Sequence, residues 1–450
     1  MNAAKLKISV AKLLEDPRIV RLRSALPALF IVGGTVRDLL QEKTPNDLDL
    51  ASPLLPDELI ELCRKESIPF YETGLKHQTL TMIPVTDAEP VEITTFRAAG
   101  MSPAGGVVQG KSIEEDLAYR DFTINAMAID VHSGSIVDPF GGTADFEKKV
   151  LRCVGSAAER FGEDPLRVMR MLRFAAQLDF QIDETTAQAS HEHLDALAHV
   201  SIERFREEFS KLLICEHPAR GLRLMAEHGV LQIFLPEIQR FVGYEQNSFH
   251  KADLFVHTIE VVSKTAPDII SRLAALFHDV GKPETLSVGD DGERHFYKHE
   301  HVGAEMTQDI LLRLRYPKHT ARAVSILVAT HMRPLLCGLG GVRRILRDTE
   351  DQFDRWRELK YADATSCKIG EEEIDGQFAA FDAILAEVRR GPEVSPLKNL
   401  ALSGEDLLAL GLKQGPEIGE ILRELHEHVL DAPEDNQREV LIELAKKRIG

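Results

Sequence analysis

Three carboxylates in the first hundred residues have the types and spacing of a metal-dependent phosphoryl-transfer site. Asp47 and Asp49 are separated by one residue in DLDLA, and Glu92 lies in the alternating stretch PVEITTF. Because side chains alternate along a strand, we expect Asp47 and Asp49 on one face and Glu92 on a neighbouring strand. Such carboxylates favour Mg²⁺, and two Mg²⁺ ions stabilise the attacking and leaving oxygens of a phosphoryl transfer. The alternative interpretation of an Asp-x-Asp motif alone is a solvated edge strand.

A glycine pair and an arginine lie upstream of these carboxylates. Gly33 and Gly34 end the apolar run LFIVG and precede a predicted helix, and Arg37 lies ten residues before Asp47. Paired glycines let backbone N–H groups approach a phosphate closely, and an arginine near the start of the helix can donate to a triphosphate. A tight strand-to-helix turn is the alternative.

A third candidate group lies at a predicted helix start. Asp164 suits an N-cap and Pro165 a first helical position, while Arg167, Arg170 and Arg173 follow at i+3 spacing. An ionised aspartate only accepts hydrogen bonds and an arginine only donates them. An Asp164/Arg167 pair therefore matches the amino donor and ring-nitrogen acceptor of cytosine and adenine and rejects guanine and uracil. A solvated basic helix face is the alternative.

A second metal site is predicted from histidines further along the chain. His278 and Asp279 are adjacent in an apolar helical stretch. The other candidate ligands are His257, His299, His331 and Asp363. Imidazole with carboxylate suits a transition metal better than Mg²⁺ alone. Core histidines of a helical scaffold are the alternative.

The elements that must position these residues change type along the chain. Short apolar or alternating stretches predict strands over 29–33, 47–51, 90–96 and 124–131, and four glycines without charge predict a loop over 98–110. From about residue 150 helical periodicity dominates. The fold class is therefore predicted to be α+β: a head of mixed sheet plus helices, followed by an all-helical body.

Composition restricts the class of protein. The 450 residues are 44% hydrophobic and 28% charged, as in globular proteins, and the five cysteines form no CxxC pair. With no signal peptide and no membrane span, we expect a cytoplasmic protein that contacts no membrane. The net charge of −18, half of it in residues 351–450, predicts no indiscriminate coating of nucleic acid. A local basic track is expected from Arg167, Arg170, Arg173, Arg204, Arg206 and Lys211.

Six stretches together resemble the class II tRNA nucleotidyltransferases, which comprise the CCA-adding enzymes and the bacterial poly(A) polymerases. They are IVGGTVRDLL, NDLDLA, VEITTFR, EEDLAYRDFTINAMA, VDPFGG and EDPLRVMRMLRF. They occur in the family's order over about residues 29–215. The resemblance implies a polymerase-β-like nucleotidyltransferase head that adds C and A from CTP and ATP to tRNA 3′ ends.

The resemblance also implies a role for each motif. Asp47 and Asp49 would hold catalytic Mg²⁺, with Glu92 as a third carboxylate. Gly33, Gly34 and Arg37 would hold the triphosphate, and Arg120, Asp121 and Asn125 would read the ribose. Asp164 and Arg167 would template the base, supported by Arg170 and Arg173.

The histidine pattern resembles the HD-domain metal-dependent phosphohydrolases over about residues 240–370. A divalent transition metal such as Ni²⁺, Mn²⁺ or Fe²⁺ is the cofactor that this resemblance implies. The expected organisation is a leader helix (1–28), the head (29–150), a neck with the base-reading helix and RNA-binding region (151–235), the HD domain (236–370) and a helical tail (371–450). The tail, with a glycine-bearing turn over 411–419, is expected to contact the tRNA body.

Two departures from the family pattern keep alternatives open. Tyr119 stands where the family usually has a second arginine before Arg120, and the segment 98–110 is short and uncharged where members that add the terminal A usually have a longer, charged loop. A CC-adding enzyme is therefore the second interpretation. Poly(A) polymerase comes third, because the stretch 74–79 resembles the CCA-adding branch, and a protein that is mainly a metal phosphohydrolase comes fourth.

Overall fold

The protein folds into two compact units, as seen in a computed structural model. The structure describes residues 3–45, 47–72, 74–75, 78–101, 107–246, 253–290, 292–367, 370–394 and 396–449. One unit comprises residues 1–208 and 227–230, and the other comprises residues 209–226 and 231–450.

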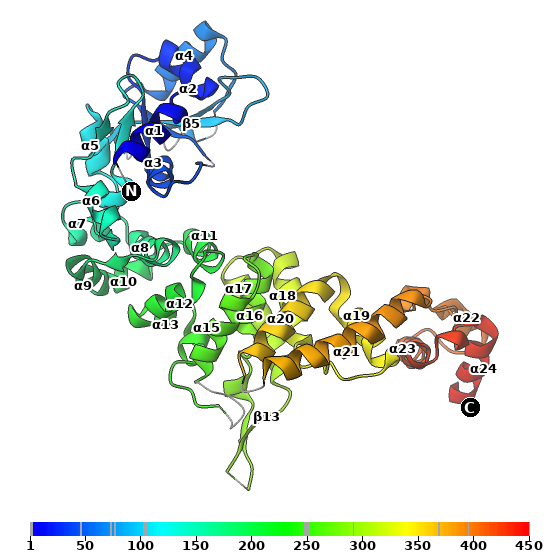
Figure 1. The fold of residues 1–450 in the computed structure, drawn as a ribbon. Helices are drawn as coiled ribbons and strands as arrows, with labels where there is room; N and C mark the ends of the chain where they lie inside the picture. Colours follow the sequence, from blue (N-terminus) through cyan, green and yellow to red (C-terminus); the bar gives the residue numbers. More distant parts are fainter. Residues whose placement is uncertain are drawn as a thin grey trace. The chain divides into compact units, whose positions relative to one another are not determined.

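A seven-stranded mixed sheet is the centre of the first unit (Figure 1). Its order is β3-β4-β5-β2-β1-β8-β9, and only β2 and β5 run parallel. The strands are β1 (Phe30–Val32), β2 (Asp49–Ser52), β3 (Phe70–Tyr71), β4 (Thr79–Met82), β5 (Val91–Thr95), β8 (Ala128–Asp130) and β9 (Ile136–Val137). The parallel pair lies at the centre of the sheet, which places Asp49 and Glu92, two of the three predicted carboxylates, on adjacent inner strands.

Helices pack on this sheet through apolar side chains. Fully buried Leu22, Leu50 and Ile93 belong to one core. The helices are α1 (Ala3–Leu13), α2 (Pro17–Ala25), α3 (Gly33–Leu40), α4 (Pro56–Glu66) and α5 (Ile113–Ala118). The prediction of a single leader helix over 1–28 is wrong. Asp16 accepts a hydrogen bond from the Arg18 N–H and Pro17 opens α2, so a second helix starts there.

Two predicted segments differ from the structure. The predicted loop 98–110 contains a two-stranded antiparallel ribbon, β6 (Arg97–Met101) with β7 (Val107–Gln109), while residues 102–106 lie outside the described residues. Hydrogen bonds between backbone groups can form such a ribbon without apolar side chains, so the glycine content of the segment did not predict its structure. The predicted strand 124–131 begins late, because a 3-10 turn (Thr123–Asn125) precedes β8.

The rest of the first unit is mainly helical, as predicted. Strands β10 (Val150–Leu151) and β11 (Gln181–Ile182) form a short parallel pair. The helices are α6 (Gly142–Glu147), α7 (Ala157–Glu163), α8 (Leu166–Leu178), α9 (Glu184–Glu192), α10 (Leu194–Leu197) and the start of α11 (Ile202–Leu213). α8 begins one residue later than predicted, although the Asp164 carboxylate accepts from the Leu166 N–H at 3.2 Å, as a capping residue does.

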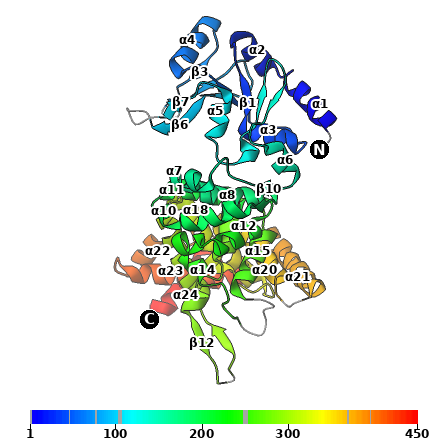
Figure 2. The ribbon, with the colours of Figure 1, turned by 90° about the vertical axis from the view of Figure 1, so that its left-hand side faces the viewer.

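The second unit is helical apart from one hairpin. Strands β12 (Leu286–Val288) and β13 (Arg294–Phe296) extend away from its helices (Figures 1 and 2). The first helices are α12 (Pro218–Glu227), α13 (Val230–Phe234), α14 (Pro236–Gln239), α15 (Leu254–Lys264), α16 (Ile269–Phe277), α17 (His299–Arg313), α18 (Lys318–Thr330) and α20 (Phe353–Thr365). α15, α16, α18 and α20 pack together, and α17 packs on α18.

The C-terminal helices continue this unit. They are α19 (Leu339–Thr349), α21 (Glu371–Arg390), α22 (Gly404–Ala409), α23 (Pro416–Asp431) and α24 (Arg438–Ile449). Arg344 joins α19 to α23, because its guanidinium donates to Glu427 at 2.7 Å and to Asp431 at 2.6 Å. The predicted turn within 411–419 separates α22 from α23, and Gly411 has a positive φ of 98° there.

Candidate functional sites

Two of the predicted carboxylates lie side by side on the central strands of the sheet. Asp49 opens β2 and is the register partner of Glu92 on β5. Register partners of a parallel pair point to the same face, so the two carboxylates are neighbours. Asp47 does not lie on the strand as predicted, because pairing starts at Asp49; it precedes β2 and is exposed.

Thr35 of α3 positions the backbone that carries both aspartates. Its hydroxyl donates to the Asp47 carbonyl at 3.0 Å and accepts from the Asp49 N–H at 3.1 Å. The side chain is 2% exposed. Sequence reasoning missed this residue, and the available signal was a hydroxyl side chain inside the glycine–arginine motif.

The start of α3 leaves no side chain between its backbone and Asp49. Gly33 has a φ of +64°, and a Cβ there would lie 3.2 Å from Asp49 Oδ2 and 3.0 Å from the Arg120 guanidinium. A Cβ on Gly34 would lie 3.6 Å from the same carboxylate oxygen. The first N–H groups of a helix are donors for anions, so this glycine pair offers a backbone approach for phosphate beside Asp49.

Asp116 positions Arg120 next to that glycine pair. Its Oδ2 accepts from Arg120 Nε at 3.1 Å and Nη2 at 3.0 Å, while Oδ1 accepts from Arg97 Nε at 3.2 Å. Burial acts to raise the pKa of this carboxyl, but the charges of Arg120 and Arg97 hold it below its usual value. Asp116 was not predicted, since an acidic residue in a short helix shortly before an arginine has no distinctive signal.

Arg37, Asn125 and Asp121 form one buried chain of hydrogen bonds. Arg37 Nη1 donates to Asn125 Oδ1 at 2.8 Å, and Asn125 Nδ2 donates to Asp121 Oδ1 at 3.0 Å. Burial lowers the pKa of Arg37, whose guanidinium lies 5.0 Å from the centre of the Phe174 ring. The predicted triphosphate and ribose residues are thus brought together, but Arg37 already has one donor occupied.

Asp121 also binds Arg170 of α8. Its Oδ2 accepts from Arg170 Nε at 2.8 Å and Nη2 at 2.7 Å. Burial acts to raise the pKa of Asp121, but the charge of Arg170 and the Asn125 hydrogen bond lower it to about 2. This carboxylate therefore stays ionised in the interior.

We expect Asp121 to make the first unit sensitive to acid. Its pKa is 3.8 when unshifted and about 2 in the fold, so its contribution of about 2 kcal/mol is complete above pH 4 and is lost as pH falls through 2. Urea unfolding followed by circular dichroism at pH 5, 4, 3 and 2 measures this. The Asp121→Asn variant should lose less stability on acidification than the unaltered chain, and parallel losses would contradict the assignment.

The arginines of α8 do not form the predicted solvated basic track. Arg167 and Arg173 are more than nine-tenths buried. Arg167 pairs with Glu163 at 2.8 Å, and Glu208 of α11 accepts from both Arg170 at 3.1 Å and Arg173 at 2.5 Å. The neighbouring helices therefore supply the counter-charges, which the i+3 spacing along α8 does not reveal.

Replacing Glu208 by glutamine should destabilise the first unit by about 3 kcal/mol, because buried Arg173 and half-buried Arg170 lose the carboxylate that they share. The denaturant midpoint measured by circular dichroism tests this. Glu207→Gln is the matched control, since Glu207 is exposed on the same helix. Equal midpoints for the two variants would show that Glu208 does not stabilise the arginine row.

The predicted base-reading pair has partners within the protein. Arg204 donates to both Asp164 oxygens, at 3.2 and 2.7 Å. Arg167 donates to the carbonyls of Arg160 and Tyr119, each at 3.1 Å. These hydrogen bonds give each of the two side chains a defined orientation. Asp164 and Arg167 are three residues apart at the start of α8.

The predicted histidine site is assembled in the second unit. Two groups of potential metal ligands share Asp279. His257 and His278 lie on the Oδ2 side, at 3.7 and 3.0 Å, and His299 and His331 lie on the Oδ1 side, at 3.2 and 3.7 Å. Asp363 Oδ1 lies 3.2 Å from His257 Nε2. All six predicted ligands converge. They lie on or directly after helices α15, α16, α17, α18 and α20.

The orientation of three imidazoles fits a bound cation. Nδ1 of His278, His299 and His331 lies 2.7–2.8 Å from a backbone carbonyl in each case, so each ring donates there. A neutral ring then has its lone pair on Nε2, and the Nε2 atoms of His299 and His331 are 3.2 Å apart. Two facing lone pairs repel unless a cation lies between them, and a carbonyl partner on Nδ1 is the usual second shell of a metal-bound histidine.

A pocket of about 510 Å³ opens at this histidine cluster. Lys282, whose Nζ lies 2.7 Å from Asp279 Oδ2, and Lys360, which donates to the His331 carbonyl, place two ammonium groups beside the ligands. Burial lowers the pKa of Lys360. β13 lines the outer part, where Tyr297 is 71% exposed and stacks on His295 at 5.4 Å. The pocket thus places potential metal ligands beside two ammonium groups, a combination that suits a phosphate ester.

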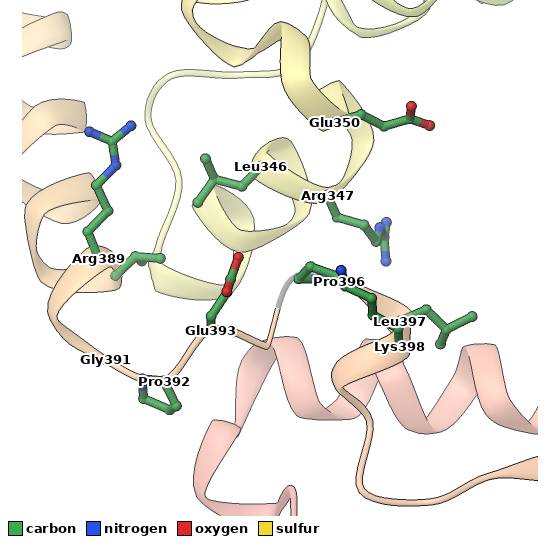
Figure 3. A pocket seen from close by; sticks show the side chains of 11 residues that line it. Leu346, Arg347, Glu350, Arg389, Gly391, Pro392, Glu393, Pro396, Leu397 and Lys398 are labelled. Atoms are coloured by element: carbon green, nitrogen blue, oxygen red, sulfur yellow. The ribbon is translucent and has the colours of Figure 1, made fainter.

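A second pocket of the same unit lies away from the cluster. Its volume is about 730 Å³ (Figure 3). Its lining residues are Leu346, Arg347, Glu350, Val388, Arg389, Gly391, Pro392, Glu393, Pro396, Leu397 and Lys398. Both basic and acidic side chains line it, so this pocket has neither a metal-ligand set nor a uniform charge. Its Arg347 already pairs with Asp348 at 2.8 Å.

Four family models match the chain, in sequence order. They are the poly A polymerase head domain (residues 29–152), the probable RNA and SrmB-binding site of polymerase A (179–242), the HD domain (255–367) and the putative tRNA nucleotidyltransferase domain 2 (342–445). Within the described residues, no helix is long and apolar enough to cross a membrane.

Curated relatives extend over almost the whole chain. An A-adding tRNA nucleotidyltransferase of Deinococcus radiodurans is 34% identical and covers 89% of this chain and 91% of its own. A CC-adding tRNA nucleotidyltransferase of Thermus thermophilus is 32% identical and covers 88% of each. A CCA-adding enzyme of Streptococcus mutans is 28% identical over 96% of each.

Solved structures share the fold. The Bacillus stearothermophilus CCA-adding enzyme, in complex with CTP, aligns with a TM-score of 0.66 at 24% identity over 98% of each chain. The Thermotoga maritima CCA-adding enzyme, complexed with tRNA, aligns with a TM-score of 0.57 at 21% identity over 98% of each chain.

Proposed function

This chain belongs to the tRNA nucleotidyltransferase family, and on that premise we propose that it adds CCA from CTP and ATP to tRNA 3′ ends. The observation that carries the proposal is the register of Asp49 with Glu92 beside the glycine start of α3. A protein that only bound RNA would need no such carboxylates next to a backbone phosphate approach.

The carboxylates are the proposed magnesium ligands of the head. Asp47 and Asp49, with Glu92, offer the hard oxygen donors that Mg²⁺ prefers. Bound Mg²⁺ would lower the pKa of the tRNA 3′-hydroxyl and neutralise charge on the leaving pyrophosphate. Thr35 holds the two aspartates in place through the backbone on either side of Leu48. The 3′-oxygen then bonds to the α-phosphorus, the hydroxyl proton is released, and the bond to pyrophosphate breaks.

The remaining site residues would bind the nucleotide. The first N–H groups of α3 lie beside the Asp49 carboxylate, so they are proposed to hold the triphosphate together with Arg37. Arg120, which lies next to the same glycine pair, is proposed to read the ribose. Asp121 and Asn125 would orient the ribose. Asp164 and Arg167 would read the base, which requires Arg204 to release the Asp164 carboxylate; Arg170 and Arg173 would support them.

Replacing Asp164 by asparagine should weaken the choice of CTP over UTP roughly 100-fold, because an amide can also donate to a base that lacks the amino group. Steady-state addition of each nucleotide to one tRNA measures the ratio. Asp195→Asn, at an exposed position of the same unit, is the control. An unchanged ratio in Asp164→Asn would remove this residue from base recognition.

CCA addition is not the one function known among the relatives, because they differ in the nucleotides that they add. The relatives include A-adding, CC-adding and CCA-adding enzymes. The described part of segment 98–110 is mainly the ribbon of β6 and β7 and carries no charge. The one charged residue of the ribbon is Arg97, which opens β6 just before the segment. Lys76 and His77 of the stretch 74–79, which favours the CCA-adding branch, lie outside the described residues. CC addition is therefore the second candidate.

Three tRNA transcripts separate these functions. They end before CCA, after the first C and after CC, and each is incubated with CTP, ATP or both before the products are sized. The proposal predicts growth to CCA from all three. Arrest at CC identifies a CC-adding enzyme, extension of the CC transcript alone an A-adding enzyme, and a long A tail a poly(A) polymerase. No extension of any transcript would contradict the proposal.

We propose that the second unit is a metal-dependent phosphohydrolase. His257, His278, Asp279 and Asp363 would hold one divalent ion and Asp279, His299 and His331 a second, with Ni²⁺, Mn²⁺ or Fe²⁺ as candidates. Lys282 and Lys360 would bind the phosphate of the substrate. Repair or trimming of tRNA ends is the corresponding role, and hydrolysis of a chromogenic phosphodiester and phosphomonoester by metal-loaded protein tests it.

The helical tail and the domain limits belong to the same proposal. Residues 371–450 are proposed to contact the tRNA body, with the turn between α22 and α23 as a site for backbone phosphate. The limits of head, neck, HD domain and tail at 150, 235 and 370 remain predictions, as does a cytoplasmic location.

A further inference from the structure

A cysteine lies next to the predicted ligands of the histidine cluster. Cys367 follows α20, the helix that carries Asp363, and lines the pocket at the cluster. Its Sγ, an oxygen of Asp363 and a ring nitrogen of His257 lie within 4.8 Å of one another. Among the described residues, the other cysteines belong to no such group. Cys367 is thus placed where a further metal ligand would be.

The thiol lies beside one of the two ligand groups. His257 belongs both to the group with His278 and Asp279 and to the group with Asp363 and Cys367. His257 Nε2 lies 3.2 Å from Asp363 Oδ1 and 3.3 Å from His278 Nε2. One ion bound among His257, His278, Asp279 and Asp363 would therefore be within reach of the sulfur, whereas His299 and His331 form the other group.

We propose that Cys367 is a thiolate ligand of the divalent ion held by His257, His278, Asp279 and Asp363. The inference rests on the proposed metal site of the second unit and adds sulfur to a set of nitrogen and oxygen donors. The metal–sulfur bond forms as the thiol proton is released to solvent, with no change of oxidation state.

A sulfur ligand has a consequence for the choice of metal. Thiolates favour Zn²⁺, Fe²⁺ and Co²⁺ over Mg²⁺ and weaken the preference of a nitrogen and oxygen site for Mn²⁺. The ion next to Cys367 should therefore be a thiophilic transition metal. Oxidation or alkylation of Cys367 should release or weaken that ion while leaving the second group intact.

Cobalt(II) is the probe for this ligand. Full-length protein is freed of metal, loaded with Co²⁺ and examined for the visible d–d bands of bound Co²⁺ and the near-ultraviolet sulfur-to-cobalt charge-transfer band. Cys367→Ser removes the sulfur with little change in size. Cys337→Ser is the matched control, because Cys337 is also half-buried in this unit but belongs to none of the ligand groups.

The expected result is a charge-transfer band in the unaltered protein and in Cys337→Ser that is absent from Cys367→Ser. The apparent Kd for Co²⁺ in Cys367→Ser should rise roughly 10-fold or more, since loss of an outer-shell partner alone costs that much. Visible bands with no charge-transfer band, or a band unchanged in Cys367→Ser, would overturn the inference and leave the metal site standing. Absence of all cobalt bands would overturn the metal site and the inference together.

Discussion

Replacing Asp49 by asparagine is expected to lower nucleotide addition to tRNA roughly 10³-fold, because the reaction loses a charged ligand at the position where charge develops. Asparagine keeps the size of the side chain and an oxygen acceptor. The bond from the Asp49 N–H to Thr35 comes from the backbone, so the local fold should be retained. Rates of CTP addition to a tRNA transcript ending before CCA, at saturating nucleotide, measure the effect.

Two comparisons make the Asp49 result specific. Glu61→Gln removes a carboxylate from an exposed position of α4 in the same unit and should leave the rate within about twofold, as most surface changes do. Phosphohydrolase activity of the Asp49→Asn protein should also be unchanged, as should that of Asp47→Ala. A transfer rate near that of the unaltered chain would show that Asp49 is not a metal ligand, and parallel loss of both activities would contradict two independent sites.

Asp279→Asn should have the second large effect, on the histidine cluster. One carboxylate oxygen faces His257 and His278 while the other faces His299 and His331, so both ligand groups lose their shared charge at once. Bound transition metal, measured by elemental analysis after dialysis, is expected to fall to background, with an apparent Kd raised roughly 100-fold or more. Metal-dependent phosphohydrolysis should be lost with it.

Nucleotide addition by Asp279→Asn should remain near the unaltered rate, since the side chains that pair with this carboxylate, namely those of His257, His278, Lys282, His299 and His331, all belong to the second unit. The matched control is Asp309→Asn on α17, outside both ligand groups. Full metal content in Asp279→Asn would show that the histidines bind the ion without a bridging carboxylate. Loss of tRNA extension in this variant would contradict the separation of the two activities.

Residues with a proposed role as metal ligands were easier to predict than residues that position other side chains. His257 and Asp363 are more than a hundred positions apart, yet an unusual residue type in a recognisable order identified both, and the structure places them 3.2 Å apart. Thr35, Asp116 and Glu208 were missed. Their side chains orient other side chains or the backbone, and such a role depends on tertiary neighbours that neither composition nor spacing contains.

The same limit explains the errors in local structure. Segment 98–110 was predicted as a loop from its glycines, but main-chain pairing of β6 with β7 does not require an apolar pattern. The arginine row of α8 was expected to supply part of a local basic track, with a solvated helix face as the alternative interpretation. It is instead neutralised by Glu163 from α7 and Glu208 from α11, so helix packing rather than helix periodicity determines its exposure.

Net charge alone was a weak guide to partners. The net charge of −18 includes carboxylates that pair with other residues of the protein. Examples are Asp121, which is bonded to Arg170, and Asp279, which lies among the histidines of the cluster. Of the predicted basic track, Arg204 and Lys211 are exposed, whereas the α8 arginines pair with carboxylates; Arg204 itself pairs with Asp164. We therefore expect tRNA recognition to depend on a few local contacts.

The most direct test is the 3′-end sequence of a tRNA transcript lacking CCA after incubation with the full-length protein, Mg²⁺, CTP and ATP. We predict that products carry the added sequence C-C-A and that no further nucleotides follow. Chelation of Mg²⁺ should leave the transcript at its starting length. If this transcript and a second one that already ends in CC both stay unextended with Mg²⁺ and both nucleotides present, the assignment of the carboxylate and glycine site of the head to nucleotidyl transfer is contradicted.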